Sequence, residues 1–169
     1  MKFDVGEVLR NPGSAMSVSC EADMSDVDLY GETVFSSPVF LSGEVRNRAG
    51  LVTFEGSVRA VGQVSCARCL EPAEVERDIP LSFTLTEELQ SADVEDYLYV
   101  GGDHLLDLHD VVRDELILSL DMVTLCKPDC KGLCPTCGKN LNAGDCACPK
   151  AAPDPRWAAL SALLSEQEN

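Results

Sequence analysis

The segment from Cys126 to Cys148 holds the residues best suited to chemistry. Its sequence, CKPDCKGLCPTCGKNLNAGDCAC, places six of the protein's nine cysteines within 23 residues. Cys134 and Cys137 are separated by two residues and followed by Gly138, which is the pattern of a zinc knuckle. A glycine at that position readily takes the left-handed conformation, in which the amides of the turn point toward sulfur. The segment therefore predicts bound zinc.

The cysteines divide into two sets of four, because four thiolates complete the tetrahedral shell of one structural zinc ion. Cys146 and Cys148 follow the knuckle and can complete a local site, which leaves Cys126 and Cys130 for the CARC sequence some 60 residues upstream. The predicted ligands are Cys134, Cys137, Cys146 and Cys148 for the local site, and Cys66, Cys69, Cys126 and Cys130 for a site that joins distant parts of the chain. In an alternative partition, the CARC pair shares its metal with the last two cysteines. Two structural Zn²⁺ ions are expected.

Disulfides and redox pairs are the competing interpretations of the same thiols. The first residues, MKFDVGE, carry acids where a secretory signal would have an apolar stretch, so we expect a cytoplasmic protein. Thiols stay reduced in that compartment, and clustered cysteines there more often bind metal. A switch in which oxidation ejects zinc uses the same residues and stays open. The ninth cysteine, Cys20, is expected to be a small buried side chain.

The charge of the chain disfavours direct contact with nucleic acid over much of its length. The 169 residues carry a formal net charge of −16. Between Glu71 and Asp121 there are fifteen acids against only Arg77 and Arg113, a balance that repels phosphate backbones. No apolar run approaches the roughly 20 residues needed to cross a bilayer, so no membrane partner is expected.

Alternation of apolar and polar residues predicts a sheet in the first half of the chain. It indicates strands over residues 39–47 and 52–64 around a turn at 48–50, with a third strand over 75–85. Gly43 and Gly56 indicate bends or a close approach of two backbones. The CARC sequence then lies in the connection between the second and third strands.

The remaining segments complete an α+β prediction. Residues 1 to about 20 are expected to form an extended arm, and Asp107 to cap a helix over 108–122 whose apolar stripe packs on the core. The fold class is a curved antiparallel sheet or small, partly open β-barrel with a packed helix and a C-terminal cysteine-rich zinc module. The expected domains are a β-rich domain ending in the amphipathic helix (1–121), the zinc-binding module (122–150), and a linker with a short C-terminal helix (151–169).

Four motifs in this order resemble the YceD family, also called domain of unknown function 177. They are CARCLEP, DVVRDELILSL, the cysteine-rich segment described above, and a final DPRWAALSAL. The resemblance covers roughly residues 35–165. Members of the family are called large ribosomal RNA subunit accumulation proteins. The resemblance implies a role in accumulation of large-subunit (23S) ribosomal RNA, and hence in ribosome biogenesis, in bacteria and plastids.

The residues themselves do not indicate an enzyme. Neither His104 nor His109 lies in a recognisable catalytic motif, and four thiolates leave a zinc ion no open position. We expect a non-enzymatic factor without a small-molecule substrate. Its expected partner is a large-subunit precursor or a basic ribosomal protein, with weak or indirect RNA contact.

A direct RNA-binding zinc ribbon is the alternative function. It would use Arg46, Arg48 and Arg59, which the alternation places on the outer face of the sheet. The simpler interpretation of these arginines is cross-strand pairing with Glu44 and Glu55.

Overall fold

The chain forms two compact units, the first spanning Met1–Cys130 and the second beginning at Lys131. The computed structural model describes residues 1–29, 31–87 and 97–149. The predicted C-terminal helix lies outside these residues. Among the helices of the described ranges, none has both the length and the apolar character needed to span a bilayer.

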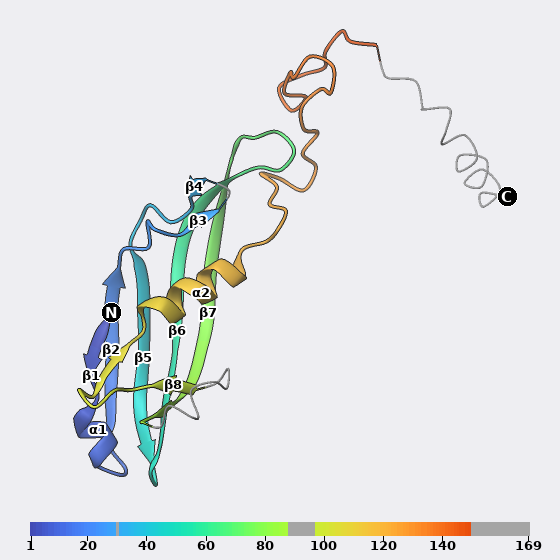
Figure 1. Ribbon diagram of the computed structural model, residues 1–169. Coiled ribbons are helices and arrows are strands. Elements are labelled where there is room, and N and C mark those ends of the chain that lie inside the picture. Colours follow the sequence, from blue (N-terminus) through green and yellow to red (C-terminus); the bar gives the residue numbers. More distant parts are fainter. Residues whose placement is uncertain (30, 88–96, 150–169) are drawn as a thin grey trace, which may run out of the picture. The chain divides into compact units, whose positions relative to one another are not determined.

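A five-stranded sheet dominates the first unit (Figure 1). In spatial order its strands are β2 (Ala15–Ala22), β5 (Val39–Arg48), β6 (Leu51–Ser65), β7 (Pro72–Thr86) and β8 (Tyr97–Tyr99). The first four are antiparallel, whereas β8 runs parallel to β7. Because β2 and β8 lie at opposite edges, the sheet is open. The predicted α+β class is confirmed, and the sheet does not close into a barrel.

The N-terminal residues are part of the fold, so the predicted extended arm is wrong. They form β1 (Lys2–Asp4), α1 (Gly6–Arg10) and the edge strand β2. β1 pairs with β9 (Leu105–Asp107), and a small ribbon joins β3 (Asp28–Leu29) to β4 (Glu32–Thr33). The reason is burial, since Val5, Val8 and Val18 belong to the hydrophobic core.

Helix α2 (His109–Ser119) covers one face of the sheet (Figure 1). Its Val112 and Leu116 are fully buried, and they belong to the same core as Phe54 of β6. The predicted helix is therefore confirmed, although it ends earlier than expected. Its N-cap residue is Leu108 rather than Asp107, whose carboxylate accepts a hydrogen bond from the His109 amide at 3.0 Å.

Two glycines allow an aromatic ring to lie against the backbone on the covered face. Gly43 and Gly56 are direct cross-strand partners, and a Cβ on Gly56 would lie 2.5 Å from the Ser42 carbonyl oxygen. The same Cβ would lie 2.9 Å from the Phe54 ring. The predicted close approach is confirmed, because only the absence of side chains at these positions leaves room for that ring.

The opposite face of the sheet carries the predicted arginines. Arg46 and Arg59 alternate with the buried residues of β5 and β6. Arg46 forms an ion pair with Glu44 of its own strand, two residues away, rather than across the strands. Glu44 lies opposite Glu55 in the register, and among the ion pairs of the described residues none joins Glu55 to Arg46, Arg48 or Arg59, so that predicted pairing is wrong.

We predict that Gly56→Ala destabilises the first unit by about 1 to 3 kcal/mol, because the added methyl group must displace backbone or the Phe54 ring. The measurement is the free energy of unfolding in urea. Gly102→Ala is the matched control, since no atom lies within 4 Å of its added Cβ. Equal stability of the two variants would contradict the close approach.

Candidate metal centres

The first set of thiols joins two segments that lie far apart in the sequence. Cys66 and Cys69 belong to the connection between β6 and β7, whereas Cys126 and Cys130 follow α2. Their four sulfur atoms all lie within 4.8 Å of one another. The Cys66 and Cys130 sulfurs are 3.8 Å apart, and those of Cys69 and Cys126 are 3.5 Å apart.

These distances fit a tetrahedral metal site. Zinc–sulfur bonds of about 2.3 Å in tetrahedral geometry place the sulfurs about 3.8 Å apart. A disulfide would bring two of them to about 2.05 Å, and all nine cysteines are free thiols in the structure. The donors are four soft sulfur ligands, which suit zinc. Cys66, Cys69 and Cys130 are buried, whereas Cys126 lies at the surface and is exposed.

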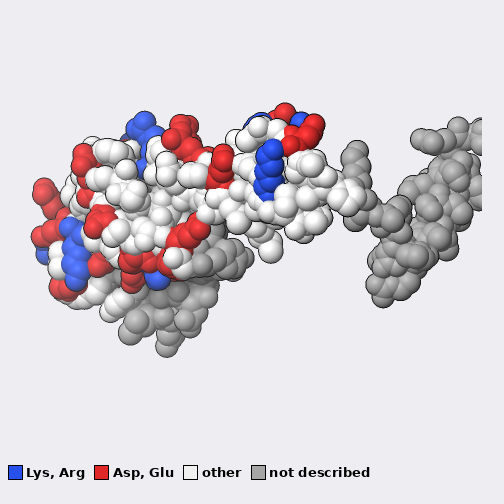
Figure 2. Space-filling view, turned by 90° about the horizontal axis from the view of Figure 1, so that it is seen from above, with Lys and Arg blue, Asp and Glu red and all other residues white. Residues whose placement is uncertain are grey.

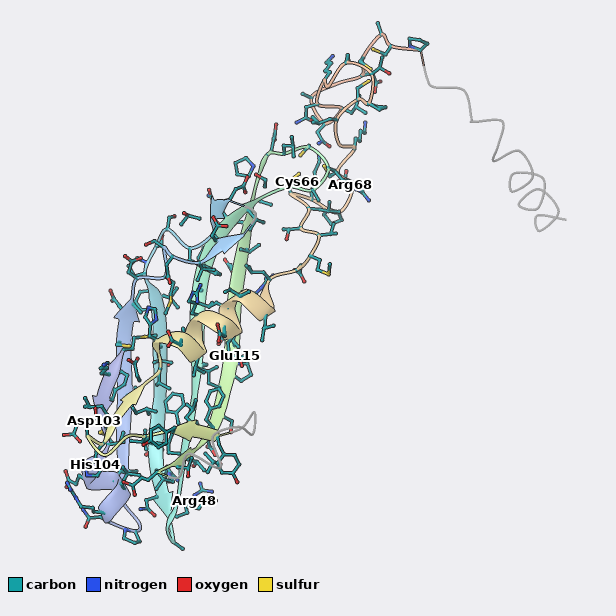
Figure 3. The ribbon with its side chains drawn as sticks, in the orientation of Figure 1. Arg48, Cys66, Arg68, Asp103, His104 and Glu115 are labelled. Atoms are coloured by element: carbon teal, nitrogen blue, oxygen red, sulfur yellow. The ribbon has the colours of Figure 1, made fainter. Side chains whose placement is uncertain are left out.

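Backbone and side-chain hydrogen bonds hold the two segments of the first set together. The Cys66 amide donates to the Glu71 carbonyl at 2.9 Å and closes the connection between β6 and β7. The Ala67 amide donates to the Thr124 carbonyl at 2.9 Å, which links the two segments. Arg68 lies in the same connection as Cys66 (Figure 3), and its guanidinium donates to the Cys130 carbonyl at 2.9 Å. Arg68 therefore positions the segment that carries Cys126 and Cys130.

Arg77 fixes the end of α2 to β7. Its guanidinium donates to the Ser119 carbonyl at 2.8 Å and to the Asp121 carboxylate at 2.9 Å. From the sequence, Arg77 is one of two basic residues in an acidic stretch and interrupts the apolar alternation of the predicted third strand, but no role could be assigned to it. The informative signal was its position, because Arg77 lies opposite the buried Ala60 on a strand that otherwise alternates regularly.

The second set lies within the unit that begins at Lys131. The sulfurs of Cys134, Cys137, Cys146 and Cys148 also lie within 4.8 Å of one another. The Gly138 amide donates to the Cys134 carbonyl at 2.8 Å, and Gly138 has the left-handed φ of 71° that the knuckle pattern predicts. The Cys134 amide donates to the Lys139 carbonyl at 2.8 Å. These bonds form the tight turn that points both sulfurs inward.

The first set repeats this turn without its glycine. The Leu70 amide donates to the Cys66 carbonyl at 2.9 Å, as the Gly138 amide does to Cys134. Leu70 accordingly takes a left-handed φ of 62°. That conformation costs a residue with a Cβ about 1 to 2 kcal/mol. The structure thus resolves how CARC forms a knuckle although leucine follows it.

Backbone amides favour one thiolate in each set. The Cys126 amide is the main cause that lowers the pKa of Cys66 from its ordinary value of 9.0 to about 6. The Cys137 amide does the same for Cys134, whose pKa is also lowered to about 6. Each set therefore has a sulfur that is already deprotonated at neutral pH and can act as the first ligand.

The remaining thiols resist losing their protons in the absence of a cation. The hydrogen bond with the Cys69 sulfur, followed by burial, raises the pKa of Cys126 to about 12. The hydrogen bond with the Cys137 sulfur likewise raises the pKa of Cys148 to about 12. A second negative charge beside the first is unfavourable unless a divalent cation compensates it. Metal binding must therefore displace protons from both sets.

The other candidate residues lie outside these sets. The thiol of Cys20 is 3.5 Å from the Met1 sulfur, and this cysteine is only half-buried rather than buried as expected. The His104 ring lies 3.5 Å from the Glu87 carboxylate, and that of His109 lies 3.3 Å from Asp110. Neither histidine belongs to a metal-binding group among the described residues.

Residues 54–164 match the family described as "Large ribosomal RNA subunit accumulation protein YceD". A maize protein named "Large ribosomal RNA subunit accumulation protein YCED homolog 1, chloroplastic" is 30% identical over 80% of this chain. An uncharacterized protein of Mycobacterium tuberculosis is 32% identical, with 99% of this chain and 76% of that protein aligned. The uncharacterized protein YlbN of Bacillus subtilis is 28% identical over 99% of both chains.

The relatives that match this chain differ in length, and some are much longer than the part that it covers. This chain covers 59% of the maize protein and 58% of a relative in Arabidopsis thaliana that has the same name. No solved structure matches the chain.

We predict that the protein purified without chelator carries two zinc ions, measured by native mass spectrometry. Cys66→Ser should leave one ion, because the second set shares no ligand with the first. It should also lower stability strongly, since structural zinc contributes roughly 10 kcal/mol or more of binding free energy that is linked to folding. Cys20→Ser is the control and should retain both ions. Two ions in Cys66→Ser would refute the first site, and none in the wild type would refute both.

Acid should release the metal. The pKa values of Cys66 and Cys134 are depressed, so the fold's stabilisation of these thiolates is complete above pH 9 and is lost as the pH falls through about 6. Protons then compete with the metal for sulfur. Bound zinc, measured by mass spectrometry of metals after ultrafiltration, should be full at pH 8 and decrease below about pH 6. Full retention at pH 4 would contradict thiolate ligation.

Proposed function

Because the chain belongs to the YceD family, we propose that it supports accumulation of large-subunit (23S) ribosomal RNA as a non-enzymatic, zinc-binding assembly factor. The observation that carries this proposal is the name of its chloroplast relatives, large ribosomal RNA subunit accumulation protein. This role would place the protein in the cytoplasm of a bacterium, where the large subunit is assembled.

A structural role for zinc is the part of the proposal that the geometry supports best. Each set offers four sulfur ligands, which fill a tetrahedral shell and leave no position for water or substrate. A catalytic zinc site keeps such a position open. We therefore assign the eight cysteines to two closed sites that stabilise the fold, and no small-molecule substrate to either.

The charge of the chain supports a protein partner. A formal net charge of −16 opposes close contact with a phosphate backbone. The proposed partner is a large-subunit precursor particle, met through a basic ribosomal protein, with RNA contact weak or indirect. Nothing in this role requires a membrane.

One observation favours direct RNA binding as a second candidate. Phe40 is 51% exposed on the open face of the sheet, directly opposite Arg59 in the register. An exposed aromatic ring beside a cation can stack on a base and contact a phosphate. Glu21 and Asp78 flank the pair on the neighbouring strands, however, and their charges oppose a phosphate there.

We predict that depleting the protein lowers the ratio of mature large-subunit to small-subunit ribosomal RNA, measured by quantitative RNA sequencing. Wild-type protein supplied from a plasmid should restore the ratio. The double variant Cys134→Ser/Cys137→Ser, which lacks the second zinc site, should restore it poorly. An unchanged ratio after depletion would refute the proposed function.

Depleted cells and isolated protein together distinguish the two candidate functions. Replacing Arg46, Arg48 and Arg59 together by Ala should impair the ratio far less than loss of the zinc site. Isolated protein should bind naked 23S RNA weakly, with an affinity that collapses as salt increases. Tight, salt-resistant binding that disappears with these arginines would favour the direct RNA binder.

A further inference from the structure

Four large apolar side chains are exposed at the end of the first unit that carries the first thiol set. Met122 is 91% exposed, Leu118 79%, Leu70 66% and Val123 65%. Single exposed apolar residues are common, but several of them together mark an interaction surface. We name these four residues the apolar patch.

Contacts in the structure bring together the two segments that carry the members of the patch. Leu70 follows Cys69, whose sulfur lies 3.5 Å from that of Cys126. Val123 precedes Thr124, whose carbonyl accepts the Ala67 amide three residues before Leu70. Met122 lines a pocket together with Ala67 and Thr124. Leu118 lies in the last turn of α2, four residues before Met122.

The backbone beneath the patch is held firmly. Arg77 binds the Ser119 carbonyl and the Asp121 carboxylate, and the Ala67 amide holds Thr124. The exposure of Leu118 and Met122 is therefore a property of an ordered segment. A surface that is ordered before binding loses less conformational entropy when a partner binds.

Leu70 supplies an independent argument. It occupies the left-handed position that glycine occupies in the second knuckle, and its side chain packs little in return, since it is 66% exposed. Strained residues of this kind concentrate at functional sites. A binding role explains why a large apolar side chain occupies this left-handed position.

Acidic groups surround the patch. Asp114 lies four residues before Leu118, on the same side of α2, and Glu115 projects from the helix beside it (Figure 3). Asp121 lies next to Met122, and Arg77 is its ion-pair partner. Figure 2 shows Asp and Glu side chains spread over the visible face of the first unit, with some Lys and Arg side chains and uncharged surface between them. The α2 side of the patch thus carries the acids Asp114 and Glu115, whereas Arg77 compensates the charge of Asp121.

We propose that the apolar patch binds a basic polypeptide segment that carries large apolar side chains. This inference rests on the proposed function and names the surface through which the assembly factor meets its protein partner. Apolar side chains of the segment bury Met122 and Leu118, and its lysines or arginines pair with the acids around them. Nucleic acid does not fit, because it offers phosphates to carboxylates.

The first test measures binding to purified large-subunit precursor particles by co-sedimentation. Leu118→Ser/Met122→Ser should raise the half-saturating protein concentration about tenfold or more, because buried apolar side chains dominate such interfaces. Leu51→Ser/Val61→Ser changes exposed apolar residues of strand β6, outside the patch, so it is the matched control and should bind normally. Unchanged binding by the first variant, or equal losses in both, would overturn the proposal.

Leu70→Gly is a second variant, whose effect on binding should not arise from a loss of folding. Glycine suits the left-handed conformation, so its thermal stability and metal content should equal or exceed those of the wild type. Binding to the particles should nevertheless weaken several-fold. Full binding by this variant would show that Leu70 does not contribute to the patch, and it would contradict the argument from its left-handed conformation.

Photo-crosslinking decides the chemistry of the partner. A benzophenone amino acid at position 122 should crosslink, in the same particles, to a protein segment rich in lysine and arginine, whereas one at position 61 should not. Asp114→Lys should weaken binding more than Asp78→Lys, which makes the same charge change on the opposite face. A crosslink to RNA, to an acidic segment or to nothing would refute the proposal.

Depleted cells distinguish this proposal from the function on which it rests. If depletion leaves ribosomal RNA unchanged, the proposed function fails, whatever the patch binds. If depletion lowers large-subunit RNA and Leu118→Ser/Met122→Ser restores it fully, the function stands and the patch proposal fails. Poor restoration by this variant, with full restoration by Leu51→Ser/Val61→Ser, is the expected result.

Discussion

Four sulfur atoms within 4.8 Å of one another are the constraint on which the rest of the first unit depends. They close two loops: Cys69 and Cys126 are 57 positions apart in the sequence, and Cys66 and Cys130 are 64 positions apart. Closing each loop costs chain entropy. They also crowd the thiols, and the hydrogen bond with the Cys69 sulfur, followed by burial, raises the pKa of Cys126 to about 12. A divalent cation removes both difficulties at once, because it compensates the charge and links the segments. The zinc ion that we propose is therefore part of the fold.

This constraint determines what the surrounding residues can do. Arg68 and Arg77 attach the segment after α2 to the sheet from two sides, one through Cys130 and the other through Ser119. Leu120 packs against the core, whereas Met122 and Val123, which also lie between these attachments, do not. They remain exposed in a fixed arrangement. A structural metal site can thus serve function indirectly, through the surface that it holds in place.

The features that could be predicted from the sequence were those with a long period or a specific spacing. Alternation over residues 39–64 predicted the hairpin and its buried face, and the spacing of the cysteines predicted two sets of four before any distance was known. The elements β1 and α1 were missed because a strand of three residues and a helix of five are too short to show a period. The parallel pairing of β8 depends on tertiary packing alone, since three residues carry no directional signal. The left-handed backbone conformation of Leu70 could not be predicted for another reason. Residue propensity favours glycine in that conformation, and the hydrogen-bonded turn around Cys66 overrides the preference.

The central claim is that a metal ion in the first set holds the segment after α2 against the connection between β6 and β7. Hydrogen exchange of the Ala67 amide, followed by NMR, tests this most directly, because that amide donates to Thr124 across the two segments. We expect its exchange in Cys126→Ser to accelerate by about tenfold or more relative to the zinc-loaded wild type. The Gly138 amide of the second set should keep its protection in both proteins. Undiminished protection of Ala67 in Cys126→Ser would contradict the account, since the segments would then be held together without the metal.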